Sequence, residues 1–267
     1  GKKIAAICAE TLTPVLMECG GTDPAIIDRD IDIERVASAV LWAAMGNAGQ
    51  TCVGIERVYV HEEIAERFSE KISALASELV VGRDYGAATM PKQLAIIDSH
   101  IKDAASRGAE FLVGSVDSVQ PPFVLPTIMT NVPENSLAVA EETFGPTLTI
   151  RSVASMGEAI ALSNASQYGL AASVWSKKQG KAIASQLHCG MVSVNSVIAF
   201  TATPSMPFGG VKQSGSGRVH GPEGLREFTY TRAVVATRFR IPLNFATFKR
   251  TAAVDAFIKR FVRLLNR

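Results

Sequence analysis

The alternation of short β-branched runs with longer amphipathic stretches is the feature that most constrains the fold of this 267-residue chain. The run RVYVH at 57–61 has the composition of a strand, whereas 62–80 carries apolar residues at the helical spacings of three and four. Such alternation is typical of an α/β domain built on a mostly parallel sheet. We expect strands at 13–19, 25–29, 57–61, 148–153, 171–176 and 192–196, and helices at 32–45, 62–80, 92–107, 156–164, 178–187 and 222–227.

Charge and apolar content exclude several classes of protein. With 27 basic and 25 acidic residues, the chain lacks the one-sided basic field with which nucleic-acid-binding proteins hold phosphate. No apolar run approaches the roughly 18 to 20 residues of a membrane span, and the opening GKKIAAICAE is too short an apolar stretch for a signal peptide. We therefore expect a soluble, cytoplasmic protein. The four cysteines are widely spaced, without a CxxC pair, so we expect neither disulfides nor a metal site.

The end of the chain has a pattern of its own. The segment VDAFIKRFVRLLNR, from Val254 onward, predicts a helix with one apolar face and with Lys and Arg mostly opposite. A basic amphipathic helix can lie on an anionic membrane, but docking on its own protein or on a neighbouring subunit is commoner, and we favour docking. The segment 232–241, RAVVATRFRI, has strand composition and predicts an edge strand that pairs between subunits. We expect a homo-oligomer, either dimer or tetramer.

Two segments carry candidate chemistry. In GNAGQTCVGIERVYV at 46–60, Cys52 lies in a glycine-rich turn between a predicted helix and a predicted strand. Small neighbours would let a carbonyl approach the sulfur and leave backbone N–H groups free to hold an oxyanion. In MECGGTDPAIID at 17–28, Glu18 ends a predicted strand and is followed by two glycines that permit close backbone approach. Taken singly, a cysteine in a turn is usually core and a glutamate at a strand end is usually surface.

Together these segments resemble the aldehyde dehydrogenase superfamily, which carries its general-base Glu in an ELGG-like motif and its nucleophilic Cys in an N-x-G-Q-x-C motif. Glu18 and Cys52 lie 34 residues apart, close to the family's spacing. The resemblance continues in order through EETFGP (141–146), YGLAASVW (168–175), GMVSVN (190–195), PFGGVKQSGSGR (207–218) and GLREFTYTR (224–232). Ordered matches over about 13–235 are far more specific than any one of them.

The resemblance implies NAD- or NADP-dependent oxidation of an aldehyde to a carboxylic acid. Cys52 would add to the carbonyl to give a thiohemiacetal, and hydride transfer would leave a thioester. Glu18 would activate the water that hydrolyses this thioester, which favours an acid-forming enzyme over one that passes the acyl group to coenzyme A. An ordinary thiol with a pKa near 8.5 is only a few per cent ionised at about pH 7. The site should therefore lower that pKa or supply a base.

Further residues take roles from the same resemblance. Glu142 is implied to accept hydrogen bonds from the nicotinamide ribose, Phe144 to pack against the cofactor, and Gly20 to adjoin the cofactor site. Phe208 resembles an aromatic lining of the substrate tunnel, with ordinary core as the equal alternative. Thr51 and Val53 flank the nucleophile as substrate contacts.

Three polar residues are expected to be structural, and one residue departs from the family pattern. Asn195 should tie loop backbone together near the site, while Arg57 and Lys212 have no evident part in hydride chemistry. Cys19 stands where the family usually has Leu, which brings a second thiol near the base.

The resemblance also implies the domain organisation. The expected fold is a three-layer open-sheet catalytic domain over 19–225, preceded by a remnant of a cofactor-binding domain at 1–18. An oligomerisation strand and an amphipathic helix would follow at 226–267. Gly1 resembles the closing glycine of the family's cofactor-loop motif, so the rest of that domain is expected to be missing. The alternative function is therefore a dehydrogenase-inactive fragment that acts as a subunit-interaction module or a residual thiol esterase.

Overall fold

The computed structural model describes residues 1–239 and 247–266. The chain divides into two compact units, Gly1–Thr229 and Tyr230–Arg267. The functional assignment of 1–18, 19–225 and 226–267 stays a prediction.

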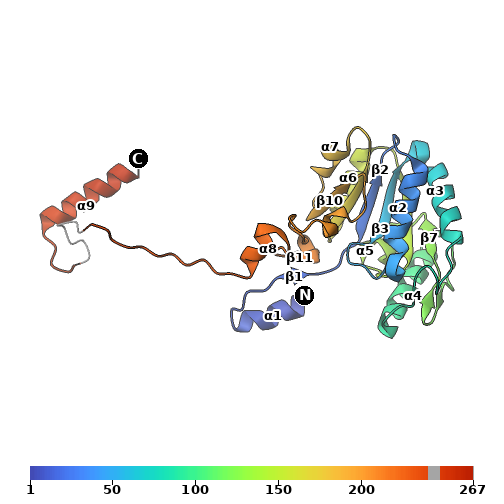
Figure 1. Ribbon diagram of the computed structural model, residues 1–267, viewed down its shortest axis with the longest axis horizontal. Helices are drawn as coiled ribbons and strands as arrows, with labels where there is room; N and C mark the ends of the chain where they lie inside the picture. The colour runs from blue at the N-terminus through green and yellow to red at the C-terminus, as the bar shows by residue number, and fades with distance from the viewer. Residues whose placement is uncertain (240–246, 267) are drawn as a thin grey trace. The chain divides into compact units, whose positions relative to one another are not determined.

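A seven-stranded sheet forms the centre of the first unit, in the strand order β10-β9-β2-β3-β8-β7-β4. Every neighbouring pair is parallel except β4 with β7, so the expected mostly parallel α/β architecture is confirmed (Figure 1). Two short pairs, β1 with β11 and β5 with β6, lie outside this sheet. The strands are β1 (Met17–Glu18), β2 (Asp23–Ile27), β3 (Ile55–His61), β4 (Glu110–Val113), β5 (Val119–Gln120), β6 (Phe123–Val124), β7 (Thr127–Thr130), β8 (Thr147–Val153), β9 (Ala171–Trp175), β10 (Met191–Val194) and β11 (Gly215–Ser216).

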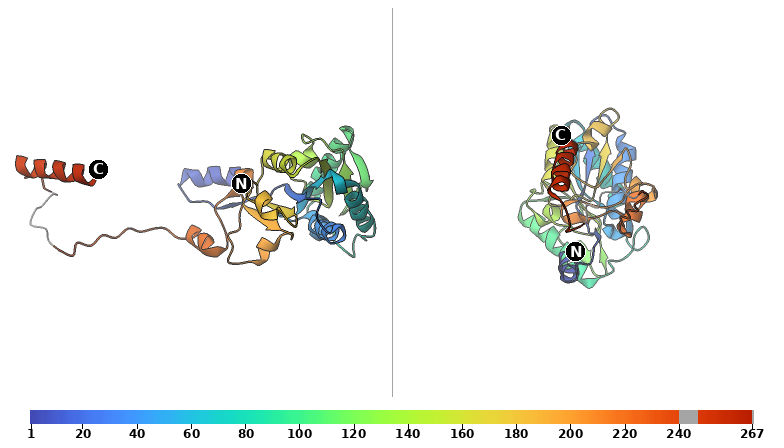
Figure 2. Two further views of the ribbon diagram at one scale, coloured as in Figure 1. Left: turned by 90° about the horizontal axis from the view of Figure 1, so that it is seen from above. Right: turned by 90° about the vertical axis from the view of Figure 1, so that its left-hand side faces the viewer.

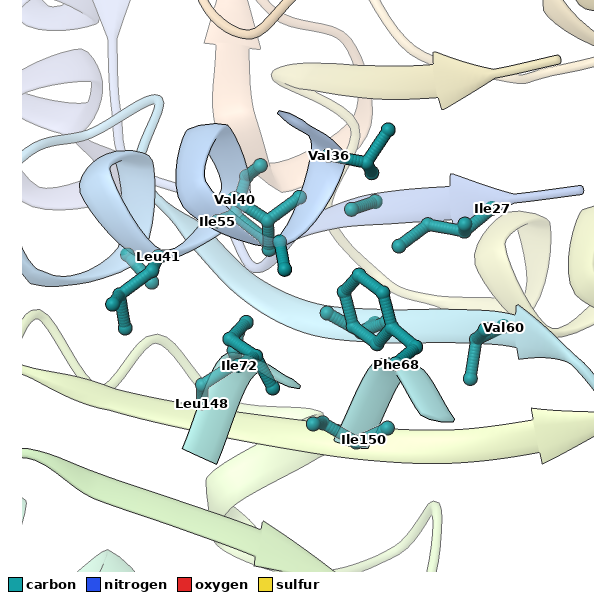
Figure 3. Close-up of a cluster of buried hydrophobic side chains, with 14 of the residues drawn as sticks. Ile27, Val36, Val40, Leu41, Ile55, Val60, Phe68, Ile72, Leu148 and Ile150 are labelled. Carbon is teal, nitrogen blue, oxygen red and sulfur yellow. The ribbon is translucent and has the colours of Figure 1, made fainter. Parts of the chain in front are cut away.

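Helices cover both faces of the sheet, because successive side chains of a strand point to opposite faces. Ile27 packs in a cluster with α2 and α3, whereas its neighbour Ile26 packs in a second cluster with α6 and α7. Figure 3 shows the first cluster, with Phe68 and Ile72 of α3 against strand residues such as Val60. The helices are α1 (Lys2–Glu10), α2 (Ile33–Met45), α3 (Glu62–Ser77), α4 (Pro91–Ser106), α5 (Leu137–Ala140), α6 (Met156–Ala165), α7 (Gly180–Ala184), α8 (Gly221–Glu227) and α9 (Ala252–Leu265).

Helix α3 shows how the pattern becomes structure. Ile64, Phe68 and Ile72, spaced by four, are all buried, and Phe68 and Ile72 are fully inaccessible. Burial of each such side chain contributes about 1.5–3 kcal/mol. Glu62 and Glu63 occupy the first turn, where the positive end of the helix dipole favours carboxylates. The predicted helix at 62–80 is therefore confirmed, although it ends at Ser77.

Several predicted boundaries are wrong. The strand expected at 13–19 is reduced to Met17–Glu18, and α1, rich in alanine, precedes it where no helix was expected. Residues 120–126, where no strand was expected, contain part of the β5–β6 pair. Strands β4 and β7 were not predicted, and the helix expected at 178–187 is shorter, at Gly180–Ala184.

The second unit contains α9, a single straight helix (Figure 2, red). The predicted C-terminal helix is therefore present. Residues 232–239 form no strand in this chain, while the last two residues of the predicted edge strand, 240 and 241, lie outside the described residues. Pairing of this segment between subunits stays a prediction. Over 1–239 and 247–266, no helix is both long and apolar enough to cross a membrane.

Candidate active site

Three of the predicted site residues lie in segments that lead into neighbouring strands of the central sheet. Glu18 precedes β2, Cys52 precedes β3 and Glu142 precedes β8. Since these three strands are parallel neighbours, their amino ends meet at the same edge of the sheet. Segments more than 120 residues apart in sequence, such as Gly21 and Glu142, come into contact there.

The nucleophile loop, residues 46–54, is shaped by the Asn and Gln of its motif. Asn47 and Ala48 adopt left-handed φ values of 55° and 57°. The Asn47 amide donates to the Gln50 carbonyl at 2.8 Å, and the Gln50 amide donates back to the Asn47 carbonyl at 3.0 Å. The Gln50 Oε1 accepts from both the backbone N–H and the hydroxyl of Thr89. These two polar residues therefore fix the loop and leave the thiol free.

Gly49 brings the nucleophile loop against the Glu142 loop, which we define as residues 141–146. Its φ is +70°, and a Cβ at this position would overlap the carbonyl group of Gly145. Only glycine satisfies both the left-handed backbone and the close approach. The two loops are therefore held in direct backbone contact.

Cys52 lies exposed in the turn that Gly54 closes by donating its N–H to the Thr51 carbonyl at 2.9 Å. Burial raises the pKa of the Cys52 thiol, and the nearby carboxyl groups of Asp23, Glu142 and Glu18 raise it further. The Val53 N–H opposes them by stabilising the thiolate. The lower thiol pKa that chemistry would favour is thus not found in this chain, and a base is the remaining route.

Glu18 lies in β1, where its partner across the strand pair is Gly215. Its carboxylate sits against Gly209, close enough that a Cβ on Gly209 would lie 3.0 Å from the Glu18 Oε1. Burial raises the pKa of Glu18, while Arg218 and His220 partly offset the rise. A carboxylate with a moderately raised pKa is suited to accept a proton near neutral pH.

Glu142 is half-buried against the Gly20–Gly21 backbone. Its Oε1 accepts from the Gly21 N–H at 3.2 Å, and a Cβ on Gly20 would overlap the carboxylate. Burial raises the pKa of Glu142, and the Gly21 hydrogen bond opposes that rise. Gly20 therefore makes room for Glu142, a relation that the sequence motifs do not reveal.

Glu56 is a buried residue that sequence reasoning missed. Its carboxylate accepts from the backbone N–H of Thr143, at 3.0 and 3.1 Å, and from that of Phe144 at 2.8 Å. Burial raises the pKa of Glu56 to about 8 despite these hydrogen bonds, and the neighbouring Glu142 adds to the rise. Glu56 thus holds the loop that carries Glu142 and Phe144.

Asp23, the first residue of β2, was also missed. It is 3% exposed, its Oδ1 accepts from the Ala171 N–H at 3.0 Å, and its Oδ2 has no partner within 1–239 and 247–266. Burial raises the pKa of Asp23 well above its usual range. The only sequence signal was a carboxylate two residues after the glycine pair.

The predicted substrate contacts divide between core and cavity. Phe208 and Val53 join one apolar cluster, in which the Phe208 ring lies 6.3 Å from that of Phe200. Val53 is buried there, so it faces the thiol through its backbone and not through its side chain. Thr51 lines a separate cavity of about 600 Å³ together with Trp42 and other residues of α2.

The three residues expected to be structural have such contacts. Asn195 accepts from the Ser176 N–H and donates to the Ser176 carbonyl, each at 3.0 Å. Arg57 donates to the Thr22 carbonyl at 2.8 Å, and Lys212 donates at 3.0 Å to the carbonyls of Asn164 in α6 and of Ser166 just after it. Arg57 and Lys212 thus brace backbone near the site. The Asn195–Ser176 pair lies past the carboxyl ends of β9 and β10, at the end of the sheet opposite the site, so the expectation that Asn195 lies near the site is wrong.

Comparisons with known proteins agree on one family. The model of the aldehyde dehydrogenase family matches residues 1–234. The chain is 36% identical over 249 residues to a putative NADP⁺ succinate-semialdehyde dehydrogenase of Mycobacterium tuberculosis, covering 89% of this chain and 48% of that protein. It is 36% identical over 251 residues to a 4,4'-diapolycopene aldehyde oxidase of Methylomonas, covering 91% and 46%. The chain spans about half the length of the curated relatives it matches.

Solved structures give the same result. An NAD-dependent aldehyde dehydrogenase of Sinorhizobium meliloti superposes with a TM-score of 0.87 at 30% identity, covering 92% of this chain and 50% of that one. Betaine aldehyde dehydrogenase of Staphylococcus aureus, determined with NAD⁺, superposes with a TM-score of 0.81 at 31% identity, covering 85% and 47%.

Proposed function

We propose, because the chain belongs to the aldehyde dehydrogenase family, that it carries the thiol nucleophile and the base of an enzyme that oxidises an aldehyde to a carboxylic acid. The observation that best supports this proposal is the meeting of the Cys52, Glu18 and Glu142 loops at one edge of the sheet. No observation favours the alternative of an inactive interaction module.

The first chemical step assigned to this chain is addition of the Cys52 sulfur to the aldehyde carbonyl. A C–S bond forms, the thiol proton leaves to a base, and the carbonyl oxygen becomes an oxyanion. Within the described part of the chain, the Cys52 N–H donates to no protein oxygen, so it is available to the oxyanion. The product is a thiohemiacetal with an sp³ carbon that still carries the aldehyde hydrogen.

The residues at this edge fit a nicotinamide dinucleotide. The half-buried Glu142 carboxylate is an acceptor suited to the vicinal hydroxyls of a ribose, and Phe144 offers an aromatic side chain on the same loop. When bound, NAD⁺ or NADP⁺ supplies the hydride acceptor that the thiohemiacetal carbon requires. Among this chain's own groups, Glu142 and Phe144 hold and orient the cofactor, and Gly20 leaves room for the carboxylate.

Glu18 is assigned the base of the last step. The acyl thioester on Cys52 is cleaved when Glu18 takes a proton from water and the resulting hydroxide attacks the thioester carbon. The C–S bond then breaks, and the carboxylic acid leaves. The Arg218 guanidinium, with His220 beside it, opposes the effect of burial on the pKa of Glu18.

The test uses the protein as its source organism makes it. Cys52→Ala should lower the rate of NAD(P)H formation by a factor of about a thousand or more, since no other group forms the covalent intermediate. Glu18→Gln should keep a first burst of about one NAD(P)H per site and slow later turnovers by about a hundredfold or more, because the burst requires only acylation and Glu18 is assigned to deacylation.

The matched control is Cys189→Ala. The Cys189 thiol donates to the Met191 carbonyl at 3.2 Å and burial raises its pKa to about 12, so its removal should leave the rate within about twofold. Full activity of Cys52→Ala would refute the proposal. Loss of the burst in Glu18→Gln would refute the assignment of Glu18 to deacylation alone.

A further inference from the structure

Helix α9 presents an apolar face that no described residue of its own unit buries. At 100° per residue, Phe257, Phe261 and Leu265 align on one side with Val254 and Ile258. Phe257 and Phe261 stack with ring centroids 6.2 Å apart and are 50% and 53% exposed. The helix buries none of its residues.

The opposite face carries positive charge. Lys259, Arg260 and Arg263 lie there, and among the described residues none of the three contacts a carboxylate. Asp255 is the only acid in the helix, and it faces Arg250 at 3.8 Å. The surface opposite the aromatic pair therefore carries three basic residues and one acidic residue, Asp255.

The charge of the chain is also divided unevenly. Residues 249–267 hold six Lys or Arg and one Asp, whereas residues 1–248 hold 21 basic and 24 acidic side chains. A chain with a total charge of only +2 thus concentrates a net +5 in its last nineteen residues. Such asymmetry indicates an anionic partner for this segment.

We propose that α9 binds the surface of a membrane rich in anionic phospholipid. A helix docked on protein through its apolar face would turn these cations toward water, where they gain little. At a bilayer, the same orientation sinks the aromatic pair among the acyl chains and lets the long Lys and Arg side chains reach the phosphates. The fourteen residues of α9 span about 21 Å, short of the roughly 30 Å hydrocarbon core, so the helix lies in the plane of the interface.

The experiment is flotation of the chain with phosphatidylcholine vesicles, with or without phosphatidylglycerol, at low and high salt. We expect binding to the vesicles that contain phosphatidylglycerol, weakened by salt. The variant Lys259→Gln/Arg260→Gln/Arg263→Gln should bind these vesicles about a hundredfold more weakly, since each basic residue near an anionic surface contributes about fivefold. The variant Phe257→Asp/Phe261→Asp should lose binding altogether, because it places two charges in the apolar face.

Ala256→Gln is the matched control, because it adds a polar side chain to the polar face and should bind as the unchanged chain does. A thermal melt of each variant checks that the unit 1–229 remains folded. Equal binding to both vesicle types, or binding to neither, would overturn the proposal. A further outcome would overturn it. If the unchanged chain binds no vesicles, and the Phe257→Asp/Phe261→Asp variant has a lower molar mass in solution than the unchanged chain, then the helix docks on a second subunit.

Discussion

Replacement of Gly20 by alanine should weaken cofactor binding and leave the fold nearly as stable as before. Gly20 is not in the left-handed region, so the backbone accepts an alanine, but the new Cβ would overlap the carboxylate of Glu142. That carboxylate is the far end of a flexible side chain, so it moves by about a bond length and the backbone stays in place. The Gly21 N–H to Glu142 hydrogen bond, 3.2 Å long, then breaks.

Two opposing contributions set the change in the free energy of unfolding, and one contribution sets the change in Kd for the cofactor. The lost hydrogen bond costs about 1 kcal/mol, and the loss of glycine's freedom in the unfolded chain returns about 0.4–1 kcal/mol. The free energy of unfolding should therefore change by less than about 1 kcal/mol. A displaced Glu142 forfeits a charge-assisted hydrogen bond to the ribose, worth about 1.5–3 kcal/mol, so the Kd for NAD⁺ or NADP⁺ should rise about 10- to 150-fold.

The assay is a fluorescence titration of the protein, as its source organism makes it, with the dinucleotide, paired with thermal unfolding. Gly86→Ala is the matched control, because Gly86 has no atom within 4 Å of an added Cβ and lies away from Glu142. An unchanged Kd in Gly20→Ala would refute the reasoning about Glu142. A large fall in melting temperature would refute the claim that its side chain yields before the backbone does.

Two further substitutions test how the loops are held. Gly49→Ala should destabilise the protein by about 3 kcal/mol or more, because the added Cβ would meet the rigid Gly145 carbonyl and the backbone φ of +70° disfavours alanine. The melting temperature should drop by roughly 6–12 °C. A drop of under about 2 °C would contradict this expectation. Glu56→Gln should remove a pH dependence of stability. The folded pKa of Glu56, about 8, lies above the 4.5 of the free side chain, so this group's contribution is greatest below pH 4.5 and is lost as pH rises through 8. Urea unfolding between about pH 5.5 and 8.5 should therefore show the original protein losing on the order of 3–4 kcal/mol relative to the variant, and parallel curves would contradict this.

Periodicity predicted the long elements well, because their signal is local. Helix α3 needed only the spacing of Ile64, Phe68 and Ile72. Strand β4, Glu110–Val113, alternates exposed and half-buried residues at the sheet edge, and β7 follows Pro126 with only four residues. Such short strands are defined by their partners, so composition alone did not mark them.

In the candidate site, too, residues in local motifs could be predicted and residues that depend on distant contacts could not. The motif order singled out Glu18 and Cys52, but Glu56 and Asp23 depend on backbone groups 87 and 148 residues away. No window along the chain contains both ends of such a hydrogen bond. The raised pKa of the Cys52 thiol likewise depends on the burial and the carboxylates that the fold gathers around it.

The nucleophile loop has a consequence for redesign. Its shape rests on Asn47, Gln50 and Gly49, and within the described residues the Cys52 sulfur donates no hydrogen bond that supports it. The conformation of the loop therefore does not depend on the nucleophilic atom at position 52. Exchange of that sulfur for oxygen or selenium should alter the reactivity of the site and leave the loop conformation unchanged. The nucleophilic atom can therefore be replaced without redesign of the residues that hold the loop.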